Sequence, residues 1–284
     1  MFSSVFSVSL LAAAASAAKY DYKEMGADWG EVASLCATGT EQSPINLTSS
    51  SASKSDLMQI NGYGYKNLSA RKITNNGHTV VVGTNPDGGD AYPEFQIDFP
   101  DGSKTVYQPL QFHFHAPSEH QVDGKNYDLE LHIVHQKKNT DVELGGVIGI
   151  FFDVEDGGEA ENPFISELIV DQATSTGKIT PGKINLASFL GGVDFTKYYN
   201  YKGSLTTPPC SEGIKWIVIA DVQSISPEQL QQFTGLWADN AAFSAGMGNN
   251  REVQELKSRT VYYHSGAAAL IASASVAIAS ILAF

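Results

Sequence analysis

Short runs of alternating or uniformly apolar residues, separated by turn-forming clusters, are the feature that most limits how this chain can fold. Alternation with a period of two is typical of β-strands, and apolar residues at helical spacing are scarce. Clusters such as Asn85-Pro86-Asp87-Gly88-Gly89 and Asp156-Gly157-Gly158 predict loops between the runs. Strands are therefore expected at 79–83, 94–99, 107–115, 129–135, 146–154 and 215–222.

Helices are expected to be few, short and peripheral. Ser226-Pro227-Glu228-Gln229 combines an N-cap serine with a proline at the first helical position, and a second short helix is expected over 162–171. No internal repeat is apparent, and about 245 residues between the two ends can bury the core of one domain. The sequence thus predicts a mainly β (α+β) fold, built as a single domain on a central sheet with short peripheral helices.

The two ends of the 284-residue chain differ from its middle. Residues 1–18 are small or apolar and end in a small-x-small cleavage pattern, which predicts a signal peptide; a buried N-terminal helix is the alternative. Residues 19–264 then form the folded domain. Residues 265–284 form a hydrophobic tail with three interpretations: a GPI-attachment signal removed from the mature protein, a transmembrane helix, or the end of an unanchored secreted form.

Secretion or display at the cell surface follows from the predicted signal peptide, and membrane contact is expected only through a C-terminal lipid anchor. A net charge of −13 without any Lys/Arg cluster argues against a nucleic acid partner. The oligomeric state is left open.

Two cysteines in a secreted chain predict one disulfide, Cys36 to Cys210. Asn46 and Asn67 each begin a sequon for N-glycosylation.

Three histidines carry the strongest chemical signal. His113 and His115 flank Phe114, and His132 follows seventeen residues after His115 inside another apolar run. Residues i and i+2 of a strand share a face, so the first pair can aim at one point and a neighbouring strand can add the third ring. Zinc takes three protein nitrogens in catalytic sites and keeps a water whose pKa falls to about 7. A single histidine on an apolar strand is more often structural.

Seven segments together resemble the α-class carbonic anhydrases. They are Gln42-Ser43-Pro44-Ile45, Asn76-Gly77-His78, Gln111-Phe112-His113-Phe114-His115, Ser118-Glu119-His120, Glu130-Leu131-His132-Ile133-Val134-His135, Ser204-Leu205-Thr206-Thr207-Pro208-Pro209-Cys210 and Trp216-Ile217-Val218, with a weaker match at Asn249-Asn250-Arg251. The resemblance covers nearly the whole predicted mature chain. It implies a central, twisted, mostly antiparallel sheet of about ten strands, with a metal in a conical cleft.

The resemblance implies a role for each matching residue. His113, His115 and His132 would be ligands of Zn²⁺, and Gln111 and Glu130, each two residues before a ligand, would accept hydrogen bonds from ligand rings. Asn249 would support the site as well. Glu119 and Thr206 would form a pair in which the threonine hydroxyl donates to the carboxylate and so can only accept from the zinc-bound oxygen. The apolar substrate pocket would be lined by Val134, Val147, Leu205, Thr207, Ile214 and Trp216.

His78 matches the position of the family's proton shuttle, since an imidazole of ordinary pKa near 6.5 can take up and release a proton at neutral pH. Tyr20 or Tyr22 would order water in the cleft. His120 and His135 are assigned to structure. The chain departs from the better-known members of the family at two places, Ala116-Pro117 directly after His115 and the apolar residue at position 81. Both concern the shape of the cleft rather than the metal ligands.

The implied reaction is the reversible hydration of carbon dioxide to bicarbonate and a proton, by attack of zinc-bound hydroxide with export of the proton through His78. One rival is a binding module of the same family that has lost its metal, although such a module would be expected to lack a histidine ligand. A metal-dependent hydrolase of another family is the second rival. The chain has no His-Glu-x-x-His motif that would favour it.

Overall fold

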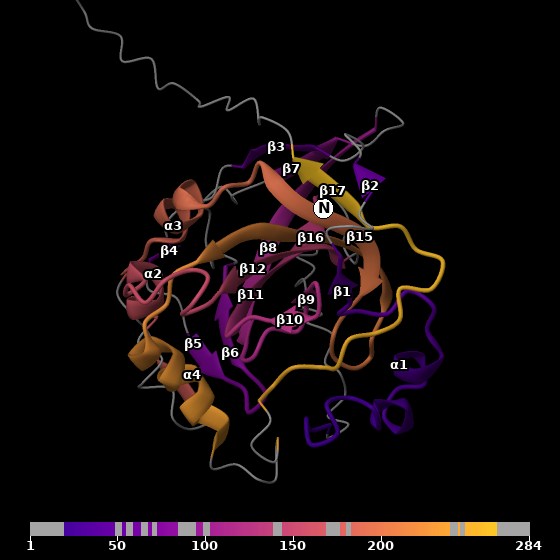
Figure 1. The fold of residues 1–284 in the computed structure, drawn as a ribbon, viewed down its shortest axis with the longest axis horizontal. Coiled ribbons are helices and arrows are strands. Elements are labelled where there is room, and N and C mark those ends of the chain that lie inside the picture. The colour runs from indigo at the N-terminus through magenta and orange to yellow at the C-terminus, as the bar shows by residue number, and fades with distance from the viewer. Residues whose placement is uncertain are drawn as a thin grey trace, which may run out of the picture.

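Strands dominate the computed structural model (Figure 1). Short helices lie at its periphery: η1 (Trp29–Glu31), α1 (Leu35–Thr38), α2 (Pro163–Ser166), α3 (Leu186–Gly192) and α4 (Pro227–Ala238). The structure describes residues 20–48, 53–54, 59–63, 68–69, 73–84, 95–98, 103–138, 144–168, 177–179, 183–238, 244 and 248–265.

One twisted sheet of 12 strands forms the centre of the described molecule. Its neighbours follow the order β13 (Gly177–Ile179), β5 (Ile73–Asn75), β6 (Val80–Gly83), β8 (Lys104–His115), β11 (Leu129–Lys137), β12 (Leu144–Phe152), β16 (Glu212–Gln223), β15 (Lys197–Ser204), β17 (Tyr262–Ser265) and β2 (Ser53–Lys54). On a branch from β8 lie β7 (Phe95–Asp98) and then β3 (Gln59–Tyr63). Only the pairs β12–β16 and β17–β2 of this sheet are parallel.

Two smaller sheets complete the strands of the described residues. The first contains β1 (Asn46–Leu47), β9 (Gln121–Val122) and β10 (Lys125–Asn126), and the second pairs β14 (Lys183–Ile184) with β4 (Leu68–Ser69). In Figure 1, α2, α3 and α4 follow one side of the central sheet, and α1 lies on the opposite side. The mainly β, single-domain prediction is confirmed, with two more strands in the sheet than the ten or so expected.

Each of the six predicted strand runs overlaps one strand, namely β6, β7, β8, β11, β12 and β16. Strand β6 begins one residue later than predicted, β12 ends at Phe152 rather than at 154, and positions 94 and 99 lie outside the described residues. The predicted helix at 226–229 is the start of α4, where the Ser226 hydroxyl oxygen accepts from the Gln229 N–H at 3.2 Å. The helix predicted over 162–171 is shorter, because α2 ends at Ser166 and only a turn follows through Leu168; positions 169–171 lie outside the described residues. Helix α3 was not expected.

The core has two parts, one on each face of the central strands. Alternate residues of β8 show this division, because Phe112 and Phe114 pack in the larger cluster while His113 and His115 face the other way. On that second face, β11, β12 and β16 contribute Val134, Val147 and Trp216 to the smaller cluster. Burying one such aromatic or aliphatic side chain contributes roughly 1.5–3 kcal/mol, so both faces hold these strands in place. The second face carries the histidines.

A disulfide between Cys36 and Cys210 is present, with 5.1 Å between the two Cα atoms, which confirms the predicted pairing. It ties α1 to the loop between β15 and β16. Asn46 is half-buried in β1, and its side-chain oxygen accepts from the Gly124 N–H at 2.9 Å. The predicted signal peptide, Asn67 of the second sequon and positions 266–284 of the tail lie outside the described residues. Among the helices that are described, none is long and apolar enough to cross a bilayer.

Candidate metal centre

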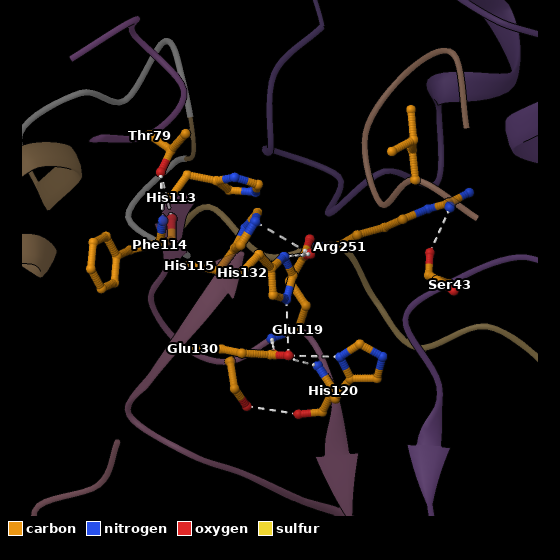
Figure 2. A network of polar contacts seen from close by, with 12 residues as sticks. Ser43, Thr79, His113, Phe114, His115, Glu119, His120, Glu130, His132 and Arg251 are labelled. Carbon is orange, nitrogen blue, oxygen red and sulfur yellow. Dashed lines mark hydrogen bonds and ion pairs between the residues drawn. The ribbon is translucent and has the colours of Figure 1, made fainter. Parts of the chain in front are cut away.

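Two antiparallel strands bring the three histidines together. The register of β8 and β11 places His132 directly opposite His113, and His115 lies two residues further along the same face of β8. One ring nitrogen from each histidine fits within 4.8 Å of the others. Figure 2 shows the three imidazoles gathered in this way. The predicted tripod is therefore formed by strand alternation together with cross-strand register.

The outward nitrogen of each ring lies close to an oxygen. His113 Nδ1 lies 2.9 Å from Gln111 Oε1, His115 Nδ1 lies 2.7 Å from the Asn249 carbonyl oxygen, and His132 Nε2 lies 2.9 Å from Glu130 Oε1. These contacts leave His113 Nε2, His115 Nε2 and His132 Nδ1 for a common ligand. His115 Nε2 is buried and has no hydrogen-bond partner among the described residues. Three imidazole nitrogens so oriented fit Zn²⁺, which prefers nitrogen ligands whose second N–H is engaged.

The electrostatics of the tripod favour neutral ligand rings at two of its three positions. Burial lowers the pKa of His113 well below its ordinary value, and the neighbouring His115 and His132 lower it further. Burial also lowers the pKa of His115, although the Glu119 carboxylate opposes the effect. His132 differs: burial would lower the pKa of its ring too, but the Glu130 and Glu119 carboxylates together raise that pKa above its ordinary value. A metal cation competes with that proton for His132, so metal affinity depends on pH.

Glu130 is the centre of a buried polar network. Its Oε2 accepts from the N–H groups of Glu119 and His120, each at 2.9 Å, while its Oε1 lies 2.8 Å from His120 Nδ1. Burial would raise the pKa of this carboxyl, but His120 and His132 hold it well below its ordinary value. A charged Glu130 thus lies behind the tripod, with its Oε1 2.9 Å from His132 Nε2 (Figure 2), and its role in orienting that ring stays a prediction.

The network continues to residues for which the sequence analysis assigned no role. His120 Nε2 lies 2.6 Å from the Tyr201 hydroxyl, which in turn lies 2.9 Å from the Ser43 hydroxyl. His120 belongs to this chain of contacts and its other nitrogen faces Glu130, so its assignment to structure agrees with its position. Ser43 lay in a recognised motif, but Tyr201 had no local signal because its contact with His120 spans 81 positions.

Glu119 lies beside the tripod. It is fully buried, its Oε1 accepts from the Arg251 N–H at 2.9 Å, and its Oε2 lies 3.4 Å from His115 Nε2 and 3.8 Å from His132 Nδ1. That Oε2 has no hydrogen-bond partner among the described residues. Thr206 is buried in the turn after β15, and its hydroxyl donation to Glu119 stays a prediction. Thr207, next in the same turn, is half-buried.

An apolar wall stands next to the tripod. Val134, Val147 and Trp216 occupy facing positions on β11, β12 and β16, and the Trp216 ring centroid lies 4.8 Å from that of His132. Ile214 is buried in the same cluster, and Leu205 packs against it. Five of the six predicted pocket residues therefore belong to one cluster on the face that carries the histidines, and the lining role of Thr207 stays a prediction. His135 points away from them, with its ring centroid 4.5 Å from that of Phe95 in the other cluster, and burial lowers its pKa to about 3.

His78 lies in the turn between β5 and β6, where the Tyr20 ring stacks on its imidazole at 4.2 Å between centroids and 17° between planes. Burial lowers the pKa of His78, while the nearby Asp21 carboxylate acts in the opposite direction. Tyr22 is the more distant of the two tyrosines, at 6.5 Å. Burial raises the pKa of Tyr20 to about 12, so its hydroxyl keeps its proton at neutral pH.

The two positions at which the chain departs from the family pattern lie close to the tripod. Val81 is half-buried and directly opposite His113 on β6. Ala116 is buried, and its N–H donates to the Asn249 side-chain oxygen at 2.8 Å. Asn249 therefore contacts the chain on both sides of His115, since its amide nitrogen also donates to the Phe114 carbonyl oxygen at 3.0 Å. This contact fixes the backbone that carries the ligand.

Comparisons with known proteins identify the family. A family model described as eukaryotic-type carbonic anhydrase matches residues 24–265. A protein named carbonic anhydrase from Pectobacterium carotovorum is 33% identical over 270 residues, which cover 91% of this chain and 96% of the relative. Alpha carbonic anhydrase 3 of Arabidopsis thaliana is 36% identical over 251 residues, which cover 85% of this chain and 79% of the relative.

A solved structure of the alpha-carbonic anhydrase from Thermovibrio ammonificans, in complex with the inhibitor sulfanilamide, is 36% identical to this chain. It has a TM-score of 0.64, with 82% of this chain and 93% of that chain covered. Both the fold and the sequence therefore agree with the motifs around the tripod. The chain belongs to the eukaryotic-type, or α-class, carbonic anhydrases, enzymes whose general reaction is the hydration of carbon dioxide.

Proposed function

We propose that this protein hydrates carbon dioxide reversibly to bicarbonate and a proton, with Zn²⁺ held by His113 Nε2, His115 Nε2 and His132 Nδ1. The observation that carries the proposal is the tripod itself, in which three nitrogens face one point while the outer nitrogens are held by Gln111, Asn249 and Glu130. Bound there, zinc supplies a nucleophile at neutral pH because it lowers the pKa of a coordinated water to about 7.

The residues of the chain perform the other tasks. Val134, Val147 and Trp216 form the wall against which a small, uncharged substrate can lie close to the tripod, since carbon dioxide has no strong hydrogen-bonding handle. Their side chains also exclude water from that side. Glu119 keeps a carboxylate oxygen next to the tripod, and we assign Thr206 the task of donating its hydroxyl proton to that oxygen. The Thr206 hydroxyl oxygen would then accept only from a protonated group at the reacting position.

Metal removal tests the proposal. Purified protein dialysed against a strong chelator should lose its zinc and its hydration activity together, and one equivalent of Zn²⁺ should restore both, because neutral imidazoles rebind the metal. Stopped-flow hydration and metal analysis on the same samples measure the two quantities. Full hydration activity in protein proven to be zinc-free would contradict the proposed function and favour another nucleophile.

His78 should carry protons rather than bind metal. We expect His78→Ala to keep its zinc and its rate of interconversion of carbon dioxide and bicarbonate, but to slow proton export about 100-fold in weak buffer, the lower end of the range typical of general acid–base groups. A high concentration of imidazole buffer should restore turnover. Isotope exchange between carbon dioxide and bicarbonate separates the two steps. Equal loss in both steps, or no rescue by imidazole, would exclude the shuttle role.

The pH profile of the wild-type protein provides a further measure of the same step. Only the neutral imidazole can accept a proton, so proton export rises with pH through the pKa of His78. Because burial lowers that pKa, we expect the rise to occur below the range of a solvent-exposed histidine. His78→Ala should lose this rise in weak buffer and otherwise keep its pH profile.

A further inference from the structure

Arg251 is a buried cation that forms no ion pair with any residue that the structure describes. The residue is only 1% exposed, and all three hydrogen bonds of its guanidinium go to neutral oxygens. Nη1 donates to the Gln42 side-chain oxygen at 3.0 Å and to the Ser43 carbonyl oxygen at 2.8 Å, and Nη2 donates to the Cys36 carbonyl oxygen at 2.8 Å. The guanidinium also lies 5.7 Å from the centroid of the Trp29 ring.

Burying the Arg251 guanidinium costs free energy, so its partners should show what the residue stabilises. A buried cation loses its hydration, and hydrogen bonds to neutral groups replace only part of it. Burial accordingly lowers the pKa of Arg251, and the nearby Glu119 carboxylate offsets the effect in part. The planar guanidinium presents its donors from separate nitrogens in a rigid fork and so reaches acceptors that lie apart, whereas the three donors of a lysine ammonium share one nitrogen.

The backbone next to Arg251 is what touches the tripod. The Arg251 N–H donates to Glu119 Oε1 at 2.9 Å, and two residues earlier the Asn249 carbonyl oxygen accepts from His115 Nδ1 at 2.7 Å. The stretch 249–251 has neither helical nor strand structure, so no ladder of backbone hydrogen bonds fixes it. It is held by the Asn249 N–H, which donates to the Ala116 carbonyl oxygen at 3.2 Å, by the side chain of Asn249 and, 208 to 215 positions away in sequence, by the partners of the Arg251 guanidinium.

We propose that Arg251 is a positioning residue, whose guanidinium anchors the stretch 249–251 to Cys36, Gln42 and Ser43 so that its backbone holds His115 and Glu119 in the orientation that metal binding requires. The proposal rests on the proposed function, because it assigns His115 to the metal. Figure 2 shows Arg251 extending from the vicinity of Glu119 and the histidines toward Ser43. Gln42 also donates to the Cys210 carbonyl oxygen at 3.1 Å, so the anchor includes both halves of the disulfide.

The test compares Arg251→Gln with the matched change Arg259→Gln. Arg259 makes three side-chain hydrogen bonds as well, to the backbone carbonyl oxygens of Leu256, Lys202 and Glu255, but none of these residues belongs to the tripod or to 249–251. We expect Arg251→Gln to weaken zinc binding about 10- to 100-fold, the usual effect of losing a group that orients a metal ligand. Arg259→Gln should bind zinc like the wild type. Competition with a chromophoric chelator measures the affinity.

A second measurement does not depend on zinc. In metal-free protein, the His115 Nδ1 proton should give a protected NMR signal because it lies in a buried hydrogen bond to Asn249. This signal should shift or exchange with solvent in Arg251→Gln and stay unchanged in Arg259→Gln. If the wild type shows the His115 signal but binds no zinc, the proposed function fails. The positioning role is then still tested by comparing that signal between the wild type and Arg251→Gln. An unchanged signal and unchanged affinity in folded Arg251→Gln would overturn the inference.

Arg251→Lys provides a milder variant in case Arg251→Gln does not fold. It keeps the charge but reaches fewer of the three acceptors, so we expect a smaller loss of zinc affinity with the same change of the His115 signal. Thermal unfolding of each metal-free variant gives the general structural effect for comparison. If Arg251→Lys is destabilised as much as Arg259→Gln yet binds zinc with wild-type affinity, Arg251 is a structural residue only.

Discussion

Replacing His132 with alanine should abolish zinc binding and carbon dioxide hydration together. The change removes one of three nitrogens that fit within 4.8 Å of one another and leaves the Glu130 carboxylate without the ring on which it acts. Two remaining imidazoles cannot hold zinc in a catalytic site, which requires three protein ligands. We expect less than about a tenth of an equivalent of zinc after dialysis. Losing a group that only orients a metal ligand already weakens metal binding about 10- to 100-fold, and losing a ligand itself should weaken it more. Hydration should fall to the buffer background.

A histidine outside the tripod provides the matched control. His264 is also buried, but it lies on β17, where its ring stacks on Tyr198 at 4.8 Å between centroids. His264→Ala should lower stability through lost packing and still bind one equivalent of zinc. Metal analysis, stopped-flow hydration and thermal unfolding of both variants separate the two effects. Hydration at the wild-type rate by folded, zinc-free His132→Ala protein would show that the tripod is not part of the mechanism.

The histidine pair on β8 could be predicted because strand alternation is a local rule. His113 and His115 share a face by their spacing alone, and Gln111 contacts His113 from two residues earlier on the same strand, as expected. The register between β8 and β11 could not be derived in this way. Any shift by two residues keeps the same side chains on the same face, so alternation alone does not place His132 opposite His113. His132 was expected from its place in another apolar run and from the family resemblance, but the spacing alone did not give this pairing.

Contacts between distant parts of the chain were outside the reach of local patterns. The Asn249 carbonyl oxygen and His115 are 134 positions apart, and the Tyr201 and Ser43 hydroxyls are 158 apart. A backbone carbonyl has no signature in the sequence, since every residue carries one. Helix α3 was missed for a different reason. It ends in Gly191-Gly192, residues of low helix propensity, and its position follows from packing of Leu186 and Leu190 in the larger core cluster.

Reducing the disulfide should lower stability more than any single surface change. The bond between Cys36 and Cys210 spans a sequence separation of 174, and cross-linking distant positions removes conformational entropy from the unfolded chain. Loss of a native disulfide typically lowers the free energy of unfolding by about 2–5 kcal/mol. For a domain of this size each kcal/mol corresponds to about 2–4 °C in Tm. Thermal unfolding with and without a reductant, followed by thiol titration, measures the effect.

The double variant Cys36→Ser/Cys210→Ser is the matched control, because it cannot respond to a reductant. We expect it to unfold near the temperature of the reduced wild type under both conditions. The effect should extend to the metal centre, since the Cys36 carbonyl oxygen accepts from Arg251 and the Cys210 N–H donates to the Thr207 carbonyl oxygen at 2.8 Å. Reduced protein should therefore release zinc to a chelator faster than oxidised protein at a temperature where both are folded. Two titratable thiols in reduced protein with no change in Tm would show that the bond does not stabilise the fold.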